Sequence, residues 1–595
     1  MKVDEIKGLE AKKYKGHGEL IKLVVEEVVK KLKKKHRSVP EHLVRIDDRV
    51  SAVRDLLDID FGDVRFIRIH GMGGIGKTTL AKVVFNEISS HFGKCCCFLD
   101  DIQEKSSRID DLVELQKKLL SEIGTHAGTK SIDEIDDGMN RIGEVLCKKK
   151  VLIVLDNVDN GKQMEKLIGR GTLCSGSRIL ITTRNKIDLR TKYQIFNYEM
   201  GVMSDDPALE LFSWHAFNRD SPSHAYDDLS REIVSATRRL PLALEIIGSF
   251  LYGNKSQKLW KETLKKLKKA PDENVFRKLK VSYDALTFEQ QQIFLDIACF
   301  FVGEDMRSAL YVWKDCEFYP HSGVRVLINM SLVKIVKNNK FWMHDQLRDL
   351  GREIVHQENR TNHGEQSRIW NCEAILDTIG TEEMKKNAVA LDLDVRKSYP
   401  EVVVRSEDIG RFKCLKYLKL YGGTFTGDLA NSLTNLSWIL WNHPHPMSNP
   451  TNMHLKNVVV LQFSDNNSID DSQLQSLITM ARKLKVLSLN GCNKITRTPD
   501  FSKCLNLESL NVNSCSNLRE IDGSIGKLKC LIDIKIVYCP HLKFLPEEIG
   551  YLVKLEEFTI QRCDGVKSIP KSIWKLKSLR EVHFSAGRGS YSADS

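Results

Sequence analysis

The last third of the chain repeats one pattern, and this repetition constrains the fold more than any other feature. The segments LKVLSLNGC, LESLNVNSC, LIDIKIVYC and LEEFTIQRC begin at Leu484, Leu507, Leu531 and Leu555, so the steps between them are 23, 24 and 24 residues. A fifth segment, LREVHF, begins at Leu579, and looser copies begin at Leu415, Leu436 and Val458. Units this short bury their leucines only by stacking on one another. We therefore expect a solenoid to which each unit contributes one strand.

The spacing within each unit identifies the type of solenoid. The template LxxLxLxx(N/C), repeated roughly every 20 to 29 residues, is that of leucine-rich repeats, which are α/β units sharing one core. The N/C position is occupied by Cys492, Cys515, Cys539 and Cys563. A small buried side chain there can bond to the backbone of the turn after the strand, so we favour a packing role over a redox or metal role.

The rest of the chain is too long for a single core. A chain of 595 residues is expected to form about three to five domains, and its 42% hydrophobic and 28% charged residues are typical of packed globular proteins. The longest apolar runs, VLIVL and ACFFV, are far shorter than the roughly 20 residues of a membrane-spanning helix. The charged start, MKVDEIKGLEAKKYKG, lacks the apolar stretch of a secretion signal. We expect a cytoplasmic protein, possible also in the nucleus, with no transmembrane segment and with mostly reduced cysteines.

The positive net charge and the lysine-flanked segment 17–36 each allow more than one interpretation. The net charge of +11 would suit nucleic acid, but much of it lies in local runs such as KKLKKKHR and LKKLKKA, so we favour solvated surface and expect no direct nucleic-acid partner. Residues 17–36 carry an apolar helical stripe, formed by Ile21, Val24, Val25, Val28 and Leu32. The stripe could lie on a membrane surface. We favour a helix that packs on the next domain, because Pro40 follows closely.

Between about 62 and 195, apolar runs alternate with helical segments. The runs VRFIRIHG, CCCFLDDI, VLIVLDNV and SRILITTR show no polar alternation, which is typical of a parallel sheet covered on both faces. We therefore predict an α/β fold over about 62–195. From 196 to 385 helical patterns dominate, with a short β pair expected at LVKIVKNNKFWMH.

A phosphate-binding loop follows the first of these strands. Gly71, four residues, then Gly76, Lys77 and Thr78 match GxxxxGK[ST], between an apolar run and a helical segment. Glycines let backbone N–H groups approach phosphates at a helix N-terminus, Lys77 would neutralise the β- and γ-phosphates, and Thr78 would bind Mg²⁺. The residues assigned to the nucleotide are Gly71, Gly73, Gly74, Ile75, Gly76, Lys77, Thr78 and Thr79.

Two later strands end in polar residues that suit the same nucleotide. Asp156 follows VLIVL and fits the acid that holds Mg²⁺ together with Thr78. Asn157 stands where a second acid would polarise the attacking water, so general-base assistance of roughly 100- to 10,000-fold would be missing. Asp159 would substitute only if the extended backbone continued past Asp156. Arg184, after SRILITT, is placed to sense the terminal phosphate, with a surface salt bridge as the alternative.

In this order, the motifs resemble those of the nucleotide-binding, leucine-rich-repeat immune receptors of plants, in the class that carries a Toll/interleukin-1 receptor-like (TIR) domain in front. The distinguishing marks are LDNVD ending at Asp159, FLDIACFF from Phe294, and WMHD with His344. The resemblance implies a multidomain fold: a linker or helix over 1–40, a P-loop NTPase domain over 41–195, a helical domain over 196–270, a winged-helix domain over 271–385 and leucine-rich repeats over 386–595.

The resemblance also implies a function. ADP would hold the resting state and ATP the active state, with oligomerisation on activation. His344 would touch the β-phosphate, Pro241 would line the adenine, and Val44 and Ile46 would flank the base. From the sequence alone, His344 is a histidine on a helix face. The repeats would recognise a pathogen effector or a guarded host protein, or hold the resting state, and the chain would form homo- or hetero-oligomers with related receptors.

Four departures from the family pattern bear on the site. Arg45 and Arg239 stand where the family usually has glycine, on either side of the expected base pocket. Asn157 replaces the usual second acid, which leaves ATP hydrolysis slow at most. Residues 1–36 resemble only the segment after a TIR domain, so we expect no NAD hydrolysis. Two other functions stay open: a turning-over ATPase, and an interaction-only regulator of full-length TIR-bearing receptors.

Overall fold

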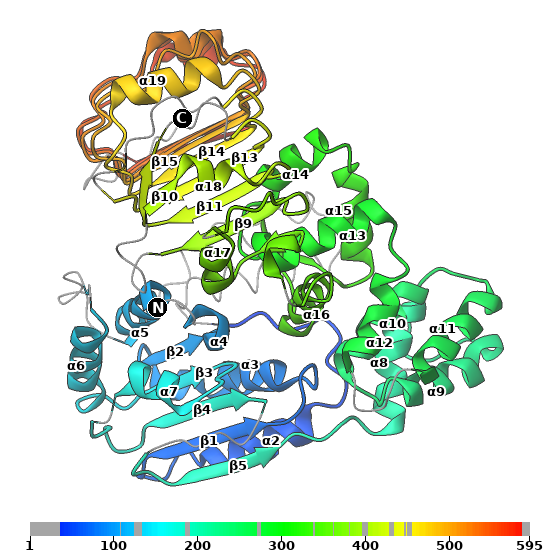
Figure 1. The fold of residues 1–595 in the computed structure, drawn as a ribbon. Coiled ribbons are helices and arrows are strands. Elements are labelled where there is room, and N and C mark those ends of the chain that lie inside the picture. Colours follow the sequence, from blue (N-terminus) through cyan, green and yellow to red (C-terminus); the bar gives the residue numbers. More distant parts are fainter. Residues whose placement is uncertain are drawn as a thin grey trace. The chain divides into compact units, whose positions relative to one another are not determined.

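The computed structural model describes residues 36–585 except for 107–108, 124–131, 133, 170, 185–190, 270–274, 337–338, 361, 380, 396–402, 428–432, 446–447 and 449–454. The helix expected over 17–36 therefore lies, but for its last residue, outside the described part. The chain divides into two compact units, Met1–Ser282 and Tyr283–Ser595, each considered by itself below (Figure 1). Within the described residues, no helix is both long and apolar enough to cross a bilayer.

The first unit contains the predicted parallel sheet. Its strands are β1 (Arg65–His70), β2 (Cys96–Leu99), β3 (Leu152–Leu155), β4 (Arg178–Thr183) and β5 (Ile195–Glu199), in the order β2-β3-β4-β1-β5. The associated helices are α2 (Asp47–Leu57), α3 (Lys77–Ile88), η3 (Ser89–Phe92), α4 (Ile102–Lys105), α5 (Ile109–Ile123), α6 (Ile135–Leu146) and α7 (Gly161–Ile168). Strands β2, β3 and β4 are buried throughout, which explains their unbroken apolar runs.

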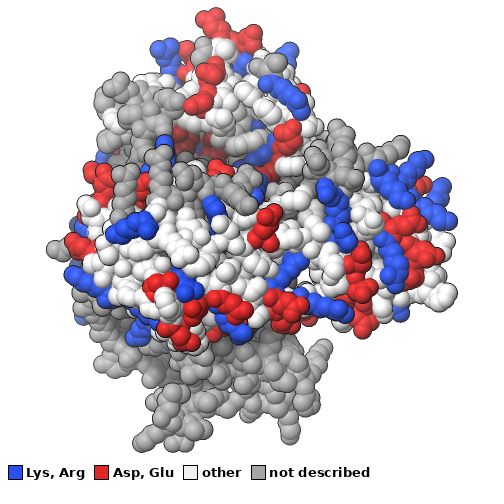
Figure 2. All heavy atoms as spheres, turned by 90° about the horizontal axis from the view of Figure 1, so that it is seen from below, with Lys and Arg blue, Asp and Glu red and all other residues white. Residues whose placement is uncertain are grey.

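Helices make up the rest of this unit. They are α8 (Asp205–Phe217), η4 (His224–Tyr226), α9 (Asp227–Ala236), α10 (Pro241–Leu251), α11 (Gln257–Lys269) and α12 (Val275–Tyr283). Their core is mostly aliphatic and includes a cluster of aromatic rings: Trp260 lies 6.0 Å from Phe212 and 5.4 Å from Phe217 between ring centroids. Over the face drawn in Figure 2, basic and acidic side chains are interspersed.

The second unit begins with a winged-helix arrangement. Its elements are α13 (Phe288–Asp296), the π-helical turn η5 (Ile297–Phe301), α14 (Met306–Asp315), α15 (Pro320–Asn329), β6 (Lys334–Val336), β7 (Lys340–Trp342), α16 (Asp345–His356) and η7 (His363–Glu365). β6 and β7 pair antiparallel, which confirms the predicted β pair.

The repeats form one parallel sheet of ten strands. These are β8 (Arg368–Ile369), β9 (Ala390–Asp394), β11 (Tyr417–Tyr421), β13 (Trp438–Asn442), β14 (Val460–Ser464), β15 (Val486–Asn490), β16 (Ser509–Asn513), β17 (Asp533–Val537), β18 (Glu557–Gln561) and β19 (Glu581–Ser585). Beside it lie α17 (Cys372–Ile379), β10 (Val403–Arg405), α18 (Ser406–Gly410), β12 (Thr424–Thr426), α19 (Asp471–Met480), η8 (Gly523–Lys527), η9 (Glu547–Tyr551) and η10 (Lys571–Lys575). From β11 onward, each strand starts two residues after a predicted repeat leucine or valine. The same sheet also includes β8 and β9, which precede the first predicted repeat at Leu415.

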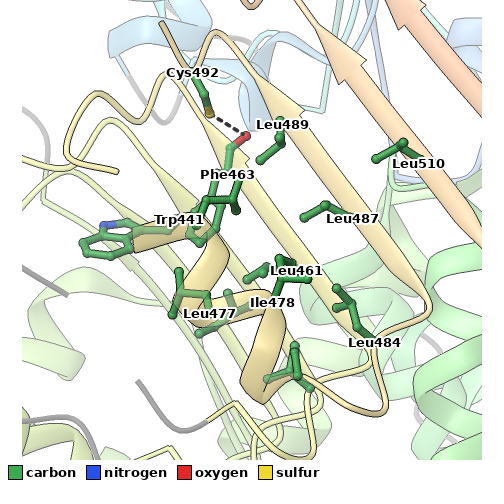
Figure 3. Close-up of a cluster of buried hydrophobic side chains, with 14 of the residues drawn as sticks. Trp441, Leu461, Phe463, Leu477, Ile478, Leu484, Leu487, Leu489, Cys492 and Leu510 are labelled. Carbon is green, nitrogen blue, oxygen red and sulfur yellow. Dashed lines mark hydrogen bonds between the residues drawn. The ribbon is translucent and has the colours of Figure 1, made fainter. Parts of the chain in front are cut away.

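The repeat cysteines pack as the sequence predicts. The Sγ atoms of Cys492, Cys515 and Cys563 donate to the carbonyls of Phe463, Leu489 and Ile536 in the preceding unit, at 3.7, 3.7 and 3.8 Å. Figure 3 shows Cys492 above the leucines of its own and neighbouring strands, including Leu461, Leu487 and Leu489. These thiols therefore satisfy backbone groups inside the shared core.

A buried carboxylate joins the winged-helix elements to the first repeat strands. Asp296 is 1% exposed, and its Oδ1 accepts from the guanidinium of Arg368 at 2.7 Å. Its Oδ2 accepts from Trp313 Nε1 at 2.7 Å and from the Tyr417 hydroxyl at 3.2 Å. Asp296 belongs to the FLDIACFF segment, so part of that sequence mark serves to fasten α13 to α14, β8 and β11.

Candidate functional site

The phosphate-binding loop connects β1 to α3, as predicted. Gly76 precedes the first residue of α3 and has a positive φ of 100°. Because β1, β3 and β4 are parallel neighbours, their carboxyl ends meet at one edge of the sheet. The loop after β1, Asp156 after β3 and Arg184 after β4 are therefore gathered at this edge, where open α/β sheets bind ligands.

Two glycines of the loop are required by close approach of neighbouring segments. A Cβ on Gly71, whose φ is 147°, would lie 2.8 Å from the carbonyl oxygen of Met200. A Cβ on Gly74, whose φ is 75°, would lie 3.0 Å from the Cβ of Leu242. Leu242 N also donates to the Gly74 carbonyl at 3.2 Å. The loop is thus held between the connection that follows β5 and the N-terminus of α10.

Lys77 lies inside the loop. Its side chain is buried, and Nζ donates to the carbonyls of Gly71 and Met72 at 2.7 and 2.8 Å. These bonds hold the ammonium over the glycine-rich backbone, whose N–H groups would donate hydrogen bonds to phosphate oxygens. Thr79 follows in the first turn of α3 and is half-buried, as are Gly73 and Gly74, whereas Ile75 is buried.

Three oxygen-bearing side chains from different elements converge next to the loop. Thr78 Oγ1 donates to Asp156 Oδ1 at 2.8 Å, and Thr182 Oγ1 donates to the same oxygen at 2.6 Å. Asp156 is 4% exposed. Sequence reasoning missed Thr182, although a threonine at the end of a strand expected beside Asp156 could have signalled it. The arrangement brings together the two residues predicted to bind the metal.

The environment of Asp156 raises its pKa to about 6. Desolvation by burial is the largest cause, and the hydrogen bonds from Thr182 and Thr78 oppose it. A hydroxyl and a carboxylate are hard oxygen ligands of the kind that Mg²⁺ prefers. Thr78 and Asp156 thus fit a Mg²⁺ ion, which would neutralise phosphate charge when bound. In the part of the chain that the structure describes, no cluster of three or more His, Cys, Asp or Glu suits a structural metal.

The residues after Asp156 do not form a second acidic position. β3 ends at Leu155, and Asn157 has a positive φ of 56°, so the extended backbone does not continue. Asn157 Nδ2 donates to Asp101 Oδ1 at 2.9 Å, and Asp159 is exposed. The condition under which Asp159 would replace the missing acid is therefore not met. Asp101, shortly after the end of β2, is a further residue that the sequence did not single out.

The residues predicted around the base belong to the same unit. Val44 is half-buried and packs against the core of the helical part, and Ile46 precedes the first turn of α2. Pro241 is the first residue of α10, adjacent to the Leu242 that contacts the loop. Arg184 is half-buried directly after β4. The contacts of these residues with a nucleotide base stay predictions.

Arg45 and Arg239 both adopt backbone conformations that favour glycine. Their φ angles are 43° and 56°. Their guanidinium groups pair with acids of one helix, α8: Arg45 lies 3.9 Å from Glu210, and Arg239 lies 2.9 Å from Asp205. The glycines that the family resemblance led us to expect at these positions thus have a physical reason, and each arginine retains some backbone strain.

His344 belongs to the second unit and is half-buried. It precedes α16, and its Nδ1 accepts from Gln346 N at 3.2 Å, which caps the helix. His344 thus lies at the N-terminal cap of α16 and not on a face of the helix. Its contact with a β-phosphate stays a prediction.

Comparison with known families agrees with this geometry. Residues 46–222 match the NB-ARC domain model, and residues 287–359 match the winged-helix domain of Roq1-like disease resistance proteins. The sheet, the phosphate-binding loop and the repeats therefore define a nucleotide-binding protein in which a P-loop NTPase domain of the NB-ARC type precedes a winged helix and a leucine-rich-repeat solenoid.

The chain is a homologue of the TIR-class disease resistance proteins of plants. It is 33% identical over 539 residues to TMV resistance protein N of Nicotiana glutinosa, in an alignment that covers 88% of this chain and 45% of that protein. It is 32% identical over 538 residues to disease resistance protein RPV1 of Vitis rotundifolia, in an alignment that covers 86% of this chain and 38% of that protein. The chain thus spans less than half the length of these relatives.

Proposed function

We propose that the chain is an intracellular nucleotide switch in plant defence signalling. ADP would hold the resting state and ATP the active state, with Mg²⁺ held by Thr78 and Asp156. The observation that carries the proposal is the meeting of Thr78 and Asp156 at 2.8 Å beside a phosphate-binding loop. Such a switch works through a difference in nucleotide affinity between two conformations, and about 5.5 kcal/mol reverses a 1:99 population.

The repeats supply a second part of the proposed function. Their sheet offers side chains of successive strands in register, which suits recognition of a pathogen effector or of a guarded host protein. The contacts of Asp296, Arg368 and Tyr417 tie the first repeat strands to the winged-helix elements, so an event on the repeats can be transmitted to them. In this proposal the active state forms oligomers with related receptors. The five predicted domain limits are also part of the proposal.

The test is the nucleotide that the purified protein retains and the stability it confers. Mass spectrometry should find ADP. ADP at 100 times its dissociation constant should stabilise the first unit by roughly 2.7 kcal/mol, seen as a higher melting temperature. Lys77→Ala should abolish the shift. Lys94→Ala is the matched control, because Lys94 is exposed and precedes β2, away from the loop. An equal shift in both variants would place the phosphates elsewhere.

A turning-over ATPase is the second candidate. Steady-state phosphate release at many turnovers per minute would favour it over the switch. The orientation of Asn157 toward Asp101 speaks against efficient turnover, because no acid follows Asp156 along an extended backbone.

A further inference from the structure

The residue after Asp156 is engaged by the neighbouring loop. Asn157 Nδ2 donates to Asp101 Oδ1 at 2.9 Å. Both residues have positive φ angles, 56° and 52°, a region that Asn and Asp adopt more readily than other non-glycine residues. Each residue thus sits at a tight turn, and the hydrogen bond joins the two turns.

Backbone hydrogen bonds also connect the two loops around this pair. Asp156 N donates to the Leu99 carbonyl at 2.9 Å, Ile102 N donates to the Asp156 carbonyl at 2.9 Å, and Gln103 N donates to the Asn157 carbonyl at 3.0 Å. The loops after β2 and β3 are therefore fastened together by successive backbone bonds. The side-chain bond between Asn157 and Asp101 completes this attachment.

Asn157 also acts on the metal-binding carboxylate through Thr182. Asn157 N donates to Thr182 Oγ1 at 2.8 Å, and Thr182 Oγ1 donates to Asp156 Oδ1 at 2.6 Å. A hydroxyl has a single hydrogen, so the bond accepted from Asn157 leaves that hydrogen directed at Asp156. The orientation of the carboxylate thus depends on where the backbone of Asn157 lies.

We propose that Asn157 is a positioning residue: by binding Asp101 it fixes the turn that orients Asp156, through Thr182, toward the metal. This inference rests on the proposed nucleotide switch and refines it.

The obvious way to restore a second acid should therefore fail. The substitution Asn157→Asp would bring two carboxylates to the 2.9 Å separation of the present hydrogen bond. Like charges so close disfavour ionisation of both groups. The side-chain bond between the loops would be lost, the turn at residue 157 would shift, and Asp156 would be oriented less well. Exchanging the two residues, with Asp101→Asn and Asn157→Asp together, keeps one amide and one carboxylate and hence the bond.

The experiment compares four full-length proteins: the wild type, Asn157→Asp, Asp101→Asn and the double exchange. Calorimetry measures the affinity for ADP with and without Mg²⁺, and a phosphate assay measures ATP hydrolysis. Asn157→Asp should lose about 10- to 100-fold of its Mg²⁺-dependent affinity, as is typical when a partner of a metal ligand is removed. It should release phosphate no faster than the wild type. Asp101→Asn is the control, because an amide oxygen can still accept from Asn157.

The double exchange distinguishes a loss of the orientation of Asp156 from general damage to the fold. It should recover Mg²⁺-dependent affinity to within about threefold of the wild type, because the pair is restored. Faster hydrolysis by Asn157→Asp with unchanged Mg²⁺ affinity would overturn the proposal, as would a double exchange that stays defective or unfolded. If Asn157→Asp fails to fold while the double exchange folds, the pair is supported. A wild type that binds no ADP would instead refute the nucleotide switch, and this inference with it.

Discussion

The hydroxyl of Thr78 donates to the carboxylate of Asp156 at 2.8 Å, although the two residues are 78 positions apart in the chain. One lies in the first turn of the helix after the phosphate-binding loop and the other follows a buried strand. Their meeting brings two sequence motifs together at the place where we propose that a magnesium nucleotide binds.

Binding of Mg²⁺ should depend on the ionisation of Asp156. Burial raises the pKa of this group to about 6, and the metal binds the carboxylate form. We expect the Mg²⁺-dependent part of ADP affinity to be constant above about pH 7 and to fall about tenfold per pH unit below about 6. Calorimetry across pH measures this.

The stability of the metal-free protein should show the opposite trend. The folded pKa of Asp156, about 6, lies above its unfolded value of about 3.9, so ionisation disfavours the folded state. The contribution of this group to stability is largest below about pH 4 and is lost as pH rises through about 6. Asp156→Asn should remove the pH dependence of the Mg²⁺-dependent ADP affinity and this group's pH dependence of stability. Its amide oxygen would still accept hydrogen bonds from Thr78 and Thr182. Retention of either trend in that variant would contradict the assignment.

Arg45→Gly should stabilise the first unit by about 0.5–1 kcal/mol. Arg45 has a φ of 43°, and glycine adopts this region without the steric cost, which outweighs its greater freedom in the unfolded chain. The pair that it loses, 3.9 Å to Glu210 at a side chain 67% exposed, contributes little. Denaturant unfolding measures the change. Arg231→Gly, in the middle of α9, is the control and should lose about 1 kcal/mol instead.

Asp296→Ala should destabilise the second unit by about 3–5 kcal/mol. The substitution leaves Arg368, which is 2% exposed, as an unpaired buried charge and removes the acceptor of Trp313 and Tyr417. Tyr417→Phe should cost only about 1 kcal/mol, because one neutral donor is lost. Replacing both charges, with Asp296→Leu and Arg368→Met, should recover much of the stability. A double variant as unstable as Asp296→Ala would show that the pair itself is required.

The cysteines of the repeats should resist alkylation in the folded protein. Cys492, Cys515, Cys539 and Cys563 are at most 1% exposed, whereas Cys147 and Cys414 are exposed. We expect iodoacetamide to modify Cys147 and Cys414 first and the four repeat cysteines only on unfolding, with mass spectrometry of peptides as the measurement. Early modification of Cys515 would mean that the repeat core opens locally.

Much of the fold could be predicted from local pattern. The 23- and 24-residue spacing placed the repeat strands, the unbroken apolar runs placed the parallel sheet, and the turn-forming residues of KNNK marked the hairpin between β6 and β7. The apolar runs and the turn lie within short windows, where side-chain period and turn chemistry act directly on the backbone, and the repeat spacing shows one such short pattern several times over. Gly71, Lys77, Thr78 and Asp156 were predicted to bind the nucleotide and its metal from local patterns of the same kind.

The tertiary structure decided what joins distant segments. No local pattern shows that Asn157 turns toward Asp101, that Thr182 shares the oxygen of Asp156 with Thr78, or that Asp296 binds Arg368 and Tyr417. The sequence by itself determined the strands and the loop, because hydrogen bonding and burial within an element follow from neighbouring residues. The orientation of each polar side chain depends on the partner that burial brings to it, and that partner is fixed only when the elements pack.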